Sequence, residues 1–228
     1  MTREKLLQIA KPILFNTEMV RAILDGRKGC TRRVVKPHPD DRHSYPLGYV
    51  TDSTDKKTVG YFGFGIDEYG GSIQYANPPY KYKPGDILYV RETWCNDKYR
   101  YMYRANYEDN EKFYRGGAEV NVKWKPSIHM PKGAARIFLK VKDVRVERLQ
   151  EITEEEAYSE GTDPWDDACY SHNGWHPTLA DPDSGGPCDI VSGFQELWNS
   201  TIKKAELEQY GWDANPWVWV IEFERIEV

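Results

Sequence analysis

The sequence predicts an α+β fold: a small, curled β-barrel with flanking helices and two long loop insertions. Apolar and polar residues alternate with period 2 in several stretches, most clearly in "ARIFLKVKDVRVERL". Short amphipathic helices with N-caps and glycine stops lie between these stretches. The chain holds 16 Tyr and 8 Trp against 7 Phe, and these residues suit strands and half-buried surfaces. We therefore expect one domain over residues 1–228, with insertions at about 38–80 and 162–189.

The first third of the chain predicts a strand, a helix and a second strand. Residues 13–15 form the first strand, and Asn16 or Thr17 caps the helix that follows. Gly26 stops this helix. "CTRRVVKP" is the second strand, ended by Pro37. Residues 38–80, rich in Gly, Pro, Asp, Ser and Tyr, form the first insertion, with a hairpin around "TVGYFGFGI".

The rest of the chain predicts further strands and two helices. "KPGDILYVRETW" is a turn and a strand, and "YMYRAN" is the next strand. The long alternating stretch shifts phase after Asp143, which predicts a bulge or bend. Thr153 and Glu156 form a capping-box signature for a helix that ends at Gly161. "IVSGFQELWNSTI" is an amphipathic helix, and "PWVWVIEFERIEV" is a closing strand whose tryptophans face a core or a seam between elements.

Charge is distributed unevenly along a chain of net charge −5. Residues 20–36 hold six Lys or Arg against one Asp, and residues 97–148 hold 13 against seven acidic residues. Residues 150–190 hold eleven acidic residues and no Lys or Arg. This balance excludes a protein that coats nucleic acid non-specifically, because such binding scales with the phosphates neutralised. A focused basic cleft remains compatible with it.

Cysteines and apolar runs indicate the compartment. The four cysteines are widely spaced, no stretch resembles a signal peptide, and the apolar runs are too short to span a bilayer. We expect a cytoplasmic protein with reduced thiols and no membrane partner.

The second insertion contains four residues that can bind zinc: Cys169, His172, His176 and Cys188. Their spacing matches no metal-site pattern, so a flexible acidic loop is the preferred interpretation. No motif specifies a nucleotide cofactor, and we expect no metal and no cofactor.

A basic turn follows the first predicted helix. "ILDGRKGCTRRVVKP" brings together Arg27, Lys28, Thr31, Arg32 and Arg33. Thr31 and Arg33 share one face if the strand begins near Cys30, and Lys28 then curls over that face because glycines give the turn its freedom. The turn either grips phosphate or holds a reactive hydroxyl.

Several motifs, in this order, resemble the ASCH family, in particular the long ASCH proteins encoded by bacteriophages. They are Gly26-x-Lys28-x-x-Thr31-x-Arg33 in the turn, the "PGDILYVRE" strand, "WKPSIHMPKGAARIFLKVKDVRVERL", "ITEEEAYSEG" and "WDANPWVWVIEFE". The resemblance covers most of the chain outside the two insertions. It implies a PUA-like fold, which is a small β-barrel with flanking helices.

The resemblance also implies RNA or nucleotide binding. Some small ASCH proteins are amidohydrolases that remove the acyl group of N4-acetylcytidine with a Lys, a Thr and a Glu, and others are described as ribonucleases. Carried over to this chain, the three residues are Lys28, Thr31 and Glu160, although Glu154, Glu155 and Glu156 lie close to the last. Gly29 and Cys30 stand where the family often has Thr or Gln, which leaves the local geometry of the turn open.

These residue types suit acyl transfer. A threonine hydroxyl attacks a carbonyl once a base takes its proton, so Thr31 is the expected nucleophile, Lys28 the base and Glu160 the acid/base partner. A backbone N–H of the glycine turn is the expected oxyanion donor. One alternative is a ribonuclease in which Lys28 and Arg33 stabilise the transition state. The other is a non-catalytic module that binds nucleic acid or protein.

Two further clusters are candidates for contacts to the expected partner, which is RNA, single-stranded nucleic acid or a modified nucleoside. Trp94 can stack on a base while Arg91 contacts phosphate, or Arg91 and Glu92 form an interior ion pair beside a core tryptophan. Lys125 and His129 can line the mouth of a cleft, with His129 as a proton carrier, or they lie beside a packed loop.

Overall fold

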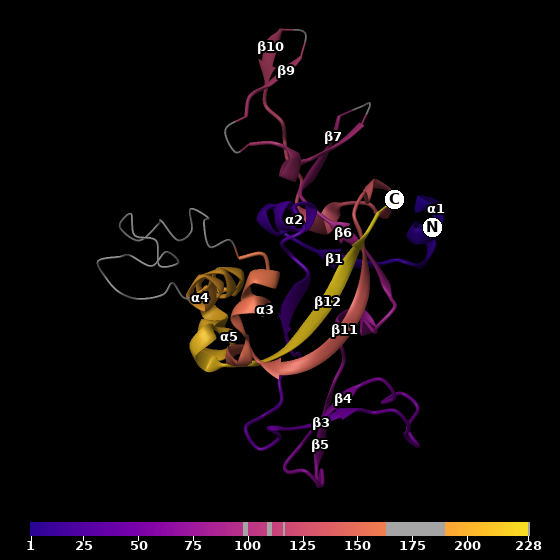
Figure 1. The fold of residues 1–228 in the computed structure, drawn as a ribbon, viewed down its shortest axis with the longest axis vertical. Helices are drawn as coiled ribbons and strands as arrows, with labels where there is room; N and C mark the ends of the chain where they lie inside the picture. The colour runs from indigo at the N-terminus through magenta and orange to yellow at the C-terminus, as the bar shows by residue number, and fades with distance from the viewer. Residues whose placement is uncertain (98–99, 109–110, 116, 163–189, 228) are drawn as a thin grey trace, which may run out of the picture. The chain divides into compact units, whose positions relative to one another are not determined.

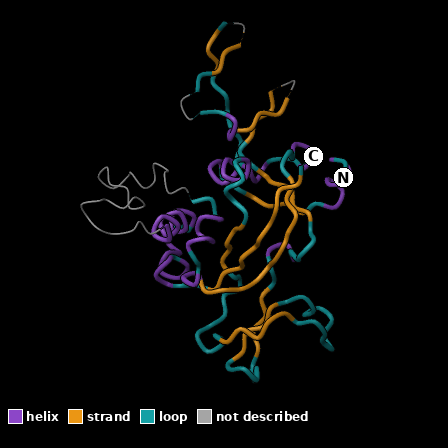
Figure 2. Tube along the Cα trace, viewed as in Figure 1, coloured by secondary structure: helices purple, strands orange, loops and turns teal. Residues whose placement is uncertain are grey.

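The computed structural model describes residues 1–97, 100–108, 111–115, 117–162 and 190–227 (Figure 1). The chain divides into two compact units, each built from several segments. Unit 1 comprises Met1–Gly29, Gly85–Val141 and Phe223–Val228, and unit 2 comprises Cys30–Pro84 and Lys142–Glu222. Helices and strands occur in both units, which confirms the α+β class (Figure 2).

The elements are as follows. The helices are α1 (Arg3–Ile9), α2 (Thr17–Leu24), α3 (Glu154–Ser159), α4 (Ile190–Thr201) and α5 (Leu207–Tyr210). The strands are β1 (Lys11–Leu14), β2 (Cys30–Val34), β3 (Tyr45–Tyr49), β4 (Phe62–Gly65), β5 (Ile73–Ala76), β6 (Ile87–Arg91), β7 (Trp94–Asp97), β8 (Arg100–Tyr103), β9 (Phe113–Arg115), β10 (Ala118–Val120), β11 (Phe138–Arg148) and β12 (Trp217–Ile226).

Unit 1 is built around β6. This strand pairs in parallel with β1 and antiparallel with the start of β11. Leu6 of α1 is fully buried and packs in one core with Trp94, Met130 and Phe138. Two antiparallel hairpins, β7–β8 and β9–β10, complete the unit (Figures 1 and 2).

Unit 2 places a strand layer between helices and a small sheet. In this unit β12 lies between β11 and β2, and it pairs antiparallel with β2. Val218 and Val220 pack with residues of α3 and α4. The opposite face of β12 carries Trp217 and Trp219, whose rings lie 5.5 and 6.0 Å from Phe64 and Phe62 of β4. The predicted tryptophan face is therefore a seam between elements.

Most predicted elements are present, with boundaries shifted by a few residues. Asn16 caps α2 by accepting a hydrogen bond from the backbone of Met19, and Thr153 and Glu156 form the predicted capping box of α3. The inward face of β11 changes between Val141 and Val144, as the phase shift predicted. The first insertion holds the three-stranded sheet β3–β4–β5, where a single hairpin was expected.

Other features of the fold differ from the sequence prediction or were not predicted. Helix α1 and the β9–β10 hairpin were not predicted. The described strands of neither unit close into a barrel. Most of the second insertion, residues 163–189, lies outside the described residues. Of the helices described, none has both the length and the apolar character that a bilayer span requires.

Candidate functional site

The basic turn begins in unit 1, where α2 ends. Gly26 adopts a φ of +79°, a left-handed conformation that suits glycine, and reverses the chain. The backbone N–H groups of Arg27 and Lys28 then both donate to the carbonyl of Ala22. Lys28 is only 4 % exposed, and its ammonium lies 5.7 Å from the centre of the Phe15 ring. A lysine this deeply buried is unusual, because the interior disfavours a charged group.

In unit 2, the turn continues as β2. Thr31 is 1 % exposed and lies opposite Ile221 of β12, while Arg33 lies opposite Trp219. Both side chains therefore share one face of the strand, as predicted. Burial lowers the pKa of the Arg33 guanidinium, and the charge of Glu160 acts in the opposite direction.

Arg32 lies on the other face of β2. Its side chain has no exposed surface, and its guanidinium lies 2.8 Å from the carboxylate of Glu156, 3.3 Å from Glu160 and 3.4 Å from Glu147. The guanidinium carbon also lies 5.8 Å from the centre of the Phe194 ring. The Arg32 guanidinium is enclosed by three carboxylates, and its predicted contact with nucleic acid stays a prediction.

Arg145 of β11 extends this arrangement. Its guanidinium donates hydrogen bonds to Glu147, Glu156 and Glu222. Burial acts to lower the pKa of Arg145, but the hydrogen bonds to Glu147 and Glu222 outweigh it and raise that pKa. We call these six residues the Arg32–Arg145 network: Arg32, Arg145, Glu147, Glu156, Glu160 and Glu222.

The network positions Glu160, the third residue of the predicted triad. Glu160 ends α3, and its backbone N–H donates to the carbonyls of Glu156 and Ala157. Its side chain is 4 % exposed and contacts Arg32 from the helix side of the strand layer. Glu156, in the first turn of the same short helix, binds both arginines, so ion pairs hold α3 at its first turn and at its C-terminal end.

Lys28 therefore belongs to unit 1, whereas Thr31 and Glu160 belong to unit 2. Only Gly29 and Cys30 separate Lys28 from Thr31 in the chain, which limits the distance between the Cα atoms of Lys28 and Thr31 to about 11 Å. Arg27 lies at the start of the turn, where it contacts Asp25 at 3.3 Å.

The cluster after β6 is interior. Glu92 is 1 % exposed and receives two hydrogen bonds of 2.9 Å from the guanidinium of Arg136. Trp94 is 6 % exposed and part of the core, which leaves no ring face for a base. Arg91 donates to the carbonyl of Ile128. The interior alternative thus describes this cluster, although the partner of Glu92 is Arg136 and not Arg91.

Lys125 and His129 are both exposed. Lys125 pairs through its backbone with Trp94, and its ammonium lies 4.8 Å from the centre of the Trp94 ring. His129 ends a short 3₁₀ turn, Ser127–His129. Lys125 is one of the residues that line a pocket of unit 1.

The polar cluster around His43 was not predicted from the sequence. The His43 ring is buried between two side chains: Nδ1 lies 2.7 Å from Asp40 and Nε2 lies 3.0 Å from the hydroxyl of Ser72. The hydrogen bond with His43 holds the pKa of Asp40 below its usual value. Gln74 bonds Asp40 at both its backbone and side chain, so the cluster fastens the segment before β3 to β5. His43 and Ser72 are 29 positions apart, so no local spacing in the sequence predicts their contact.

Comparisons with protein-family models, with curated proteins and with solved structures found no match. Within the described ranges, no group of three His, Cys, Asp or Glu side chains is arranged to hold a metal ion. The four residues weighed for zinc, Cys169, His172, His176 and Cys188, lie outside those ranges.

Proposed function

We propose that this chain is a PUA-like hydrolase of the ASCH type, which removes the acyl group of an N4-acylated cytidine. Thr31 is the nucleophile, Lys28 the base and Glu160 the acid/base partner. The substrate is a modified nucleoside, free or within RNA.

The observation that supports this proposal is the burial of the three residues. The described polar and charged residues that are buried comprise Lys28, Thr31, Arg32, His43, Glu92, Glu160 and Thr162. Burying a polar or charged group costs free energy that its partners must offset, and functional sites are among the places where proteins keep such groups. The triad expected from the motifs falls entirely within this small set.

The chemistry balances with these three groups. The Thr31 hydroxyl adds to the acyl carbonyl and gives its proton to the Lys28 amine. The bond from the acyl carbon to N4 breaks, and Lys28 returns the proton to N4, which releases cytidine. Glu160 then takes a proton from water as the water attacks the Thr31 ester, and returns it to the Thr31 oxygen as the bond from the acyl carbon to that oxygen breaks, which releases the carboxylic acid and restores both groups. In the structure Glu160 contacts Arg32 on one face of β2 while Thr31 lies on the other face, so this second step requires the Glu160 side chain to leave Arg32 and turn toward the Thr31 ester.

The test is hydrolysis of N4-acetylcytidine and other N4-acylcytidines, followed by chromatography of the released cytidine. We expect turnover by the wild type and a loss of at least about 100-fold in Thr31→Val, which keeps the shape of the side chain and removes the hydroxyl. Thr31→Ser keeps the hydroxyl and should retain part of the activity. Lys28→Met and Glu160→Gln should each lose activity with unchanged folding by circular dichroism.

Matched controls separate chemistry from general damage. Thr54→Val and Lys57→Met change the same residue types at exposed positions of unit 2 and should leave turnover unchanged. A folded wild type that releases no cytidine from any of these nucleosides contradicts the proposal. Cleavage of an RNA strand by the same preparation would favour the ribonuclease alternative.

A further inference from the structure

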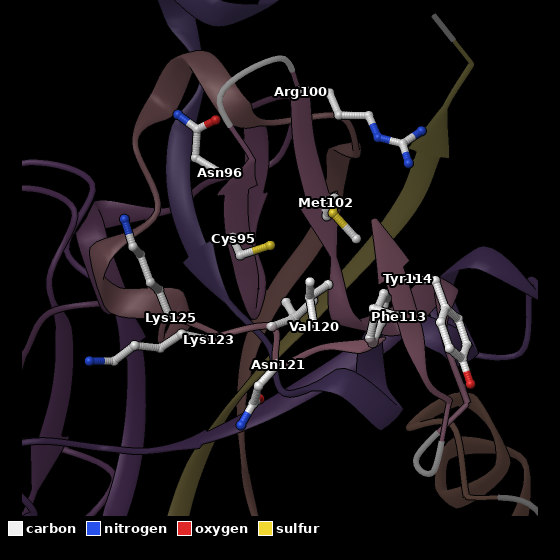
Figure 3. Close-up of a pocket in the computed structure, with 11 residues that line it drawn as sticks. Cys95, Asn96, Arg100, Met102, Phe113, Tyr114, Val120, Asn121, Lys123 and Lys125 are labelled. Atoms are coloured by element: carbon white, nitrogen blue, oxygen red, sulfur yellow. The ribbon is translucent and has the colours of Figure 1, made fainter. Parts of the chain in front are cut away.

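The two hairpins of unit 1 enclose a pocket of about 560 Å³ (Figure 3). This volume lies within the range of small-ligand sites, roughly 300–1,000 Å³. The lining residues come from both hairpins and from the segment after β10: Cys95, Asn96, Arg100, Met102, Phe113, Tyr114, Val120, Asn121, Val122, Lys123 and Lys125.

The pocket has an apolar floor and polar walls. Cys95 and Met102 are buried, and the side chain of Val120 points toward them (Figure 3). Lys123 and Lys125 lie on one side, while Arg100 lies on the other (Figure 3). The charged ends of the two lysines extend away from Cys95 and Val120, so these cations lie at the rim of the pocket (Figure 3).

The charge of the lining is one-sided. Three of its residues carry a positive charge, and none carries a carboxylate, in a chain whose net charge is −5. Lys125 is held over the Trp94 ring at 4.8 Å, which orients one of these cations. Such a surface attracts an anion.

Aromatic rings make up the rest of the recognition surface. Tyr114 is 63 % exposed, so one ring at the pocket is open to stacking. Phe113 is fixed from behind by Tyr107 and Trp124, whose ring centres lie 5.0 and 6.0 Å away. This packing ties the β9–β10 hairpin to the segment that carries Lys123 and Lys125.

We infer that this pocket binds single-stranded nucleic acid. A base stacks on Tyr114, the amides of Asn96 and Asn121 contact base edges, and the three cations contact flanking phosphates. An acidic peptide would satisfy the cations but would leave the ring and the amides unused. The inference does not depend on the proposed hydrolysis, because Lys28, Thr31 and Glu160 are not among the lining residues.

The experiment is fluorescence anisotropy with a labelled 12-nucleotide oligouridylate, repeated at several salt concentrations. In Lys123→Ala/Lys125→Ala we expect weaker binding and a salt slope that is lower by about 0.7 for each lost phosphate contact. In Tyr114→Ala we expect the dissociation constant to rise about fivefold or more, since a stacked base contributes at least about that much. Lys5→Ala/Lys57→Ala and Tyr69→Ala remove the same groups at exposed positions outside the pocket and should bind as the wild type does.

Each other outcome overturns the inference. A folded wild type that does not bind the strand, equal losses in pocket and control variants, or tighter binding of an oligoglutamate peptide would each do so. Thr31→Val distinguishes the two proposals, because it should abolish nucleoside hydrolysis and leave strand binding intact. The pocket variants should lose strand binding and keep hydrolysis of the free nucleoside.

Discussion

Arg32 shows how much one buried side chain can organise. Its guanidinium has no exposed surface and contacts three carboxylates, all on residues that follow it by more than 100 positions. Pairs of this kind are weak evidence of added stability when intact, but breaking one leaves buried charge without compensation. The contribution of Arg32 to the free energy of unfolding is therefore best measured by removing its side chain.

We predict that Arg32→Met lowers the free energy of unfolding by about 3–5 kcal/mol, the usual cost of breaking a buried ion pair. Methionine fills much of the space but leaves Glu147, Glu156 and Glu160 in mutual repulsion. Urea unfolding monitored by tryptophan fluorescence measures the loss. Arg42→Met, at an exposed arginine of the same unit, should cost less than about 0.5 kcal/mol. Similar losses in both variants would contradict the role given to Arg32.

For single residues, the sequence predicted the face on which a side chain lies better than it predicted the residues that the side chain contacts. Alternation along a strand placed Thr31 and Arg33 on one face, because that rule acts between neighbours. The partners of Arg32 come from β11 and α3, at separations of 115, 124 and 128 residues. Spacing carries no information over such distances, so the ion pairs of Arg32 could not be predicted from the sequence.

Among the elements, α3 is the clearest case of a short helix fixed by charge. It has six residues, and a helix of this length is not stable alone in water. The capping box satisfies backbone donors of its first turn, and Glu156 also binds Arg32 and Arg145. The side chain of Glu156 therefore both caps the helix and forms ion pairs.

This arrangement predicts unequal costs for the two halves of the capping box. Thr153→Ala removes one cap and should cost about 1 kcal/mol of unfolding free energy. Glu156→Gln should cost at least about 1 kcal/mol more, because two guanidinium groups lose a charged partner. Glu154→Gln in the same turn is exposed and serves as the control. Equal losses in Thr153→Ala and Glu156→Gln by urea unfolding would mean that capping alone fixes the helix.

Elements with local signals were predicted, and those without them were missed. The N-cap of α2, the capping box of α3 and the phase shift of β11 are each written in a few adjacent residues. Helix α1 has neither a capping side chain nor more than one buried residue, and its place depends on packing of Leu6 in the core of unit 1. The β9–β10 hairpin likewise depends on contacts of Phe113 with distant rings.

Over the whole chain, the net charge opposes contact with polyanions, whereas the hairpin pocket favours it. A duplex presents a dense row of phosphates, which the net negative charge of the chain repels. Its bases are stacked inside the helix, so none of them can contact Tyr114. A single strand can bend one base into the pocket and keep the rest of its backbone at a distance.

We therefore predict that a 12-base-pair duplex binds at least about tenfold more weakly than the single strand at the same salt concentration. Anisotropy titrations of the two ligands under identical conditions give the ratio. Tyr114→Ala should reduce the difference in affinity between the single strand and the duplex, because it removes a contact that only the single strand can make. Equal affinity of duplex and strand in the wild type would mean that phosphate contacts dominate.

The carboxylate of Glu156 has a consequence for how this chain can change over generations. It caps a helix and binds two arginines at once, so no single replacement at position 156 can satisfy all of its partners. A compensating change at position 32 would leave position 145 unmatched, and the reverse holds as well. Viable variants are expected to alter these three positions as a block, and intermediates with one or two changes should be depleted in a mutational library.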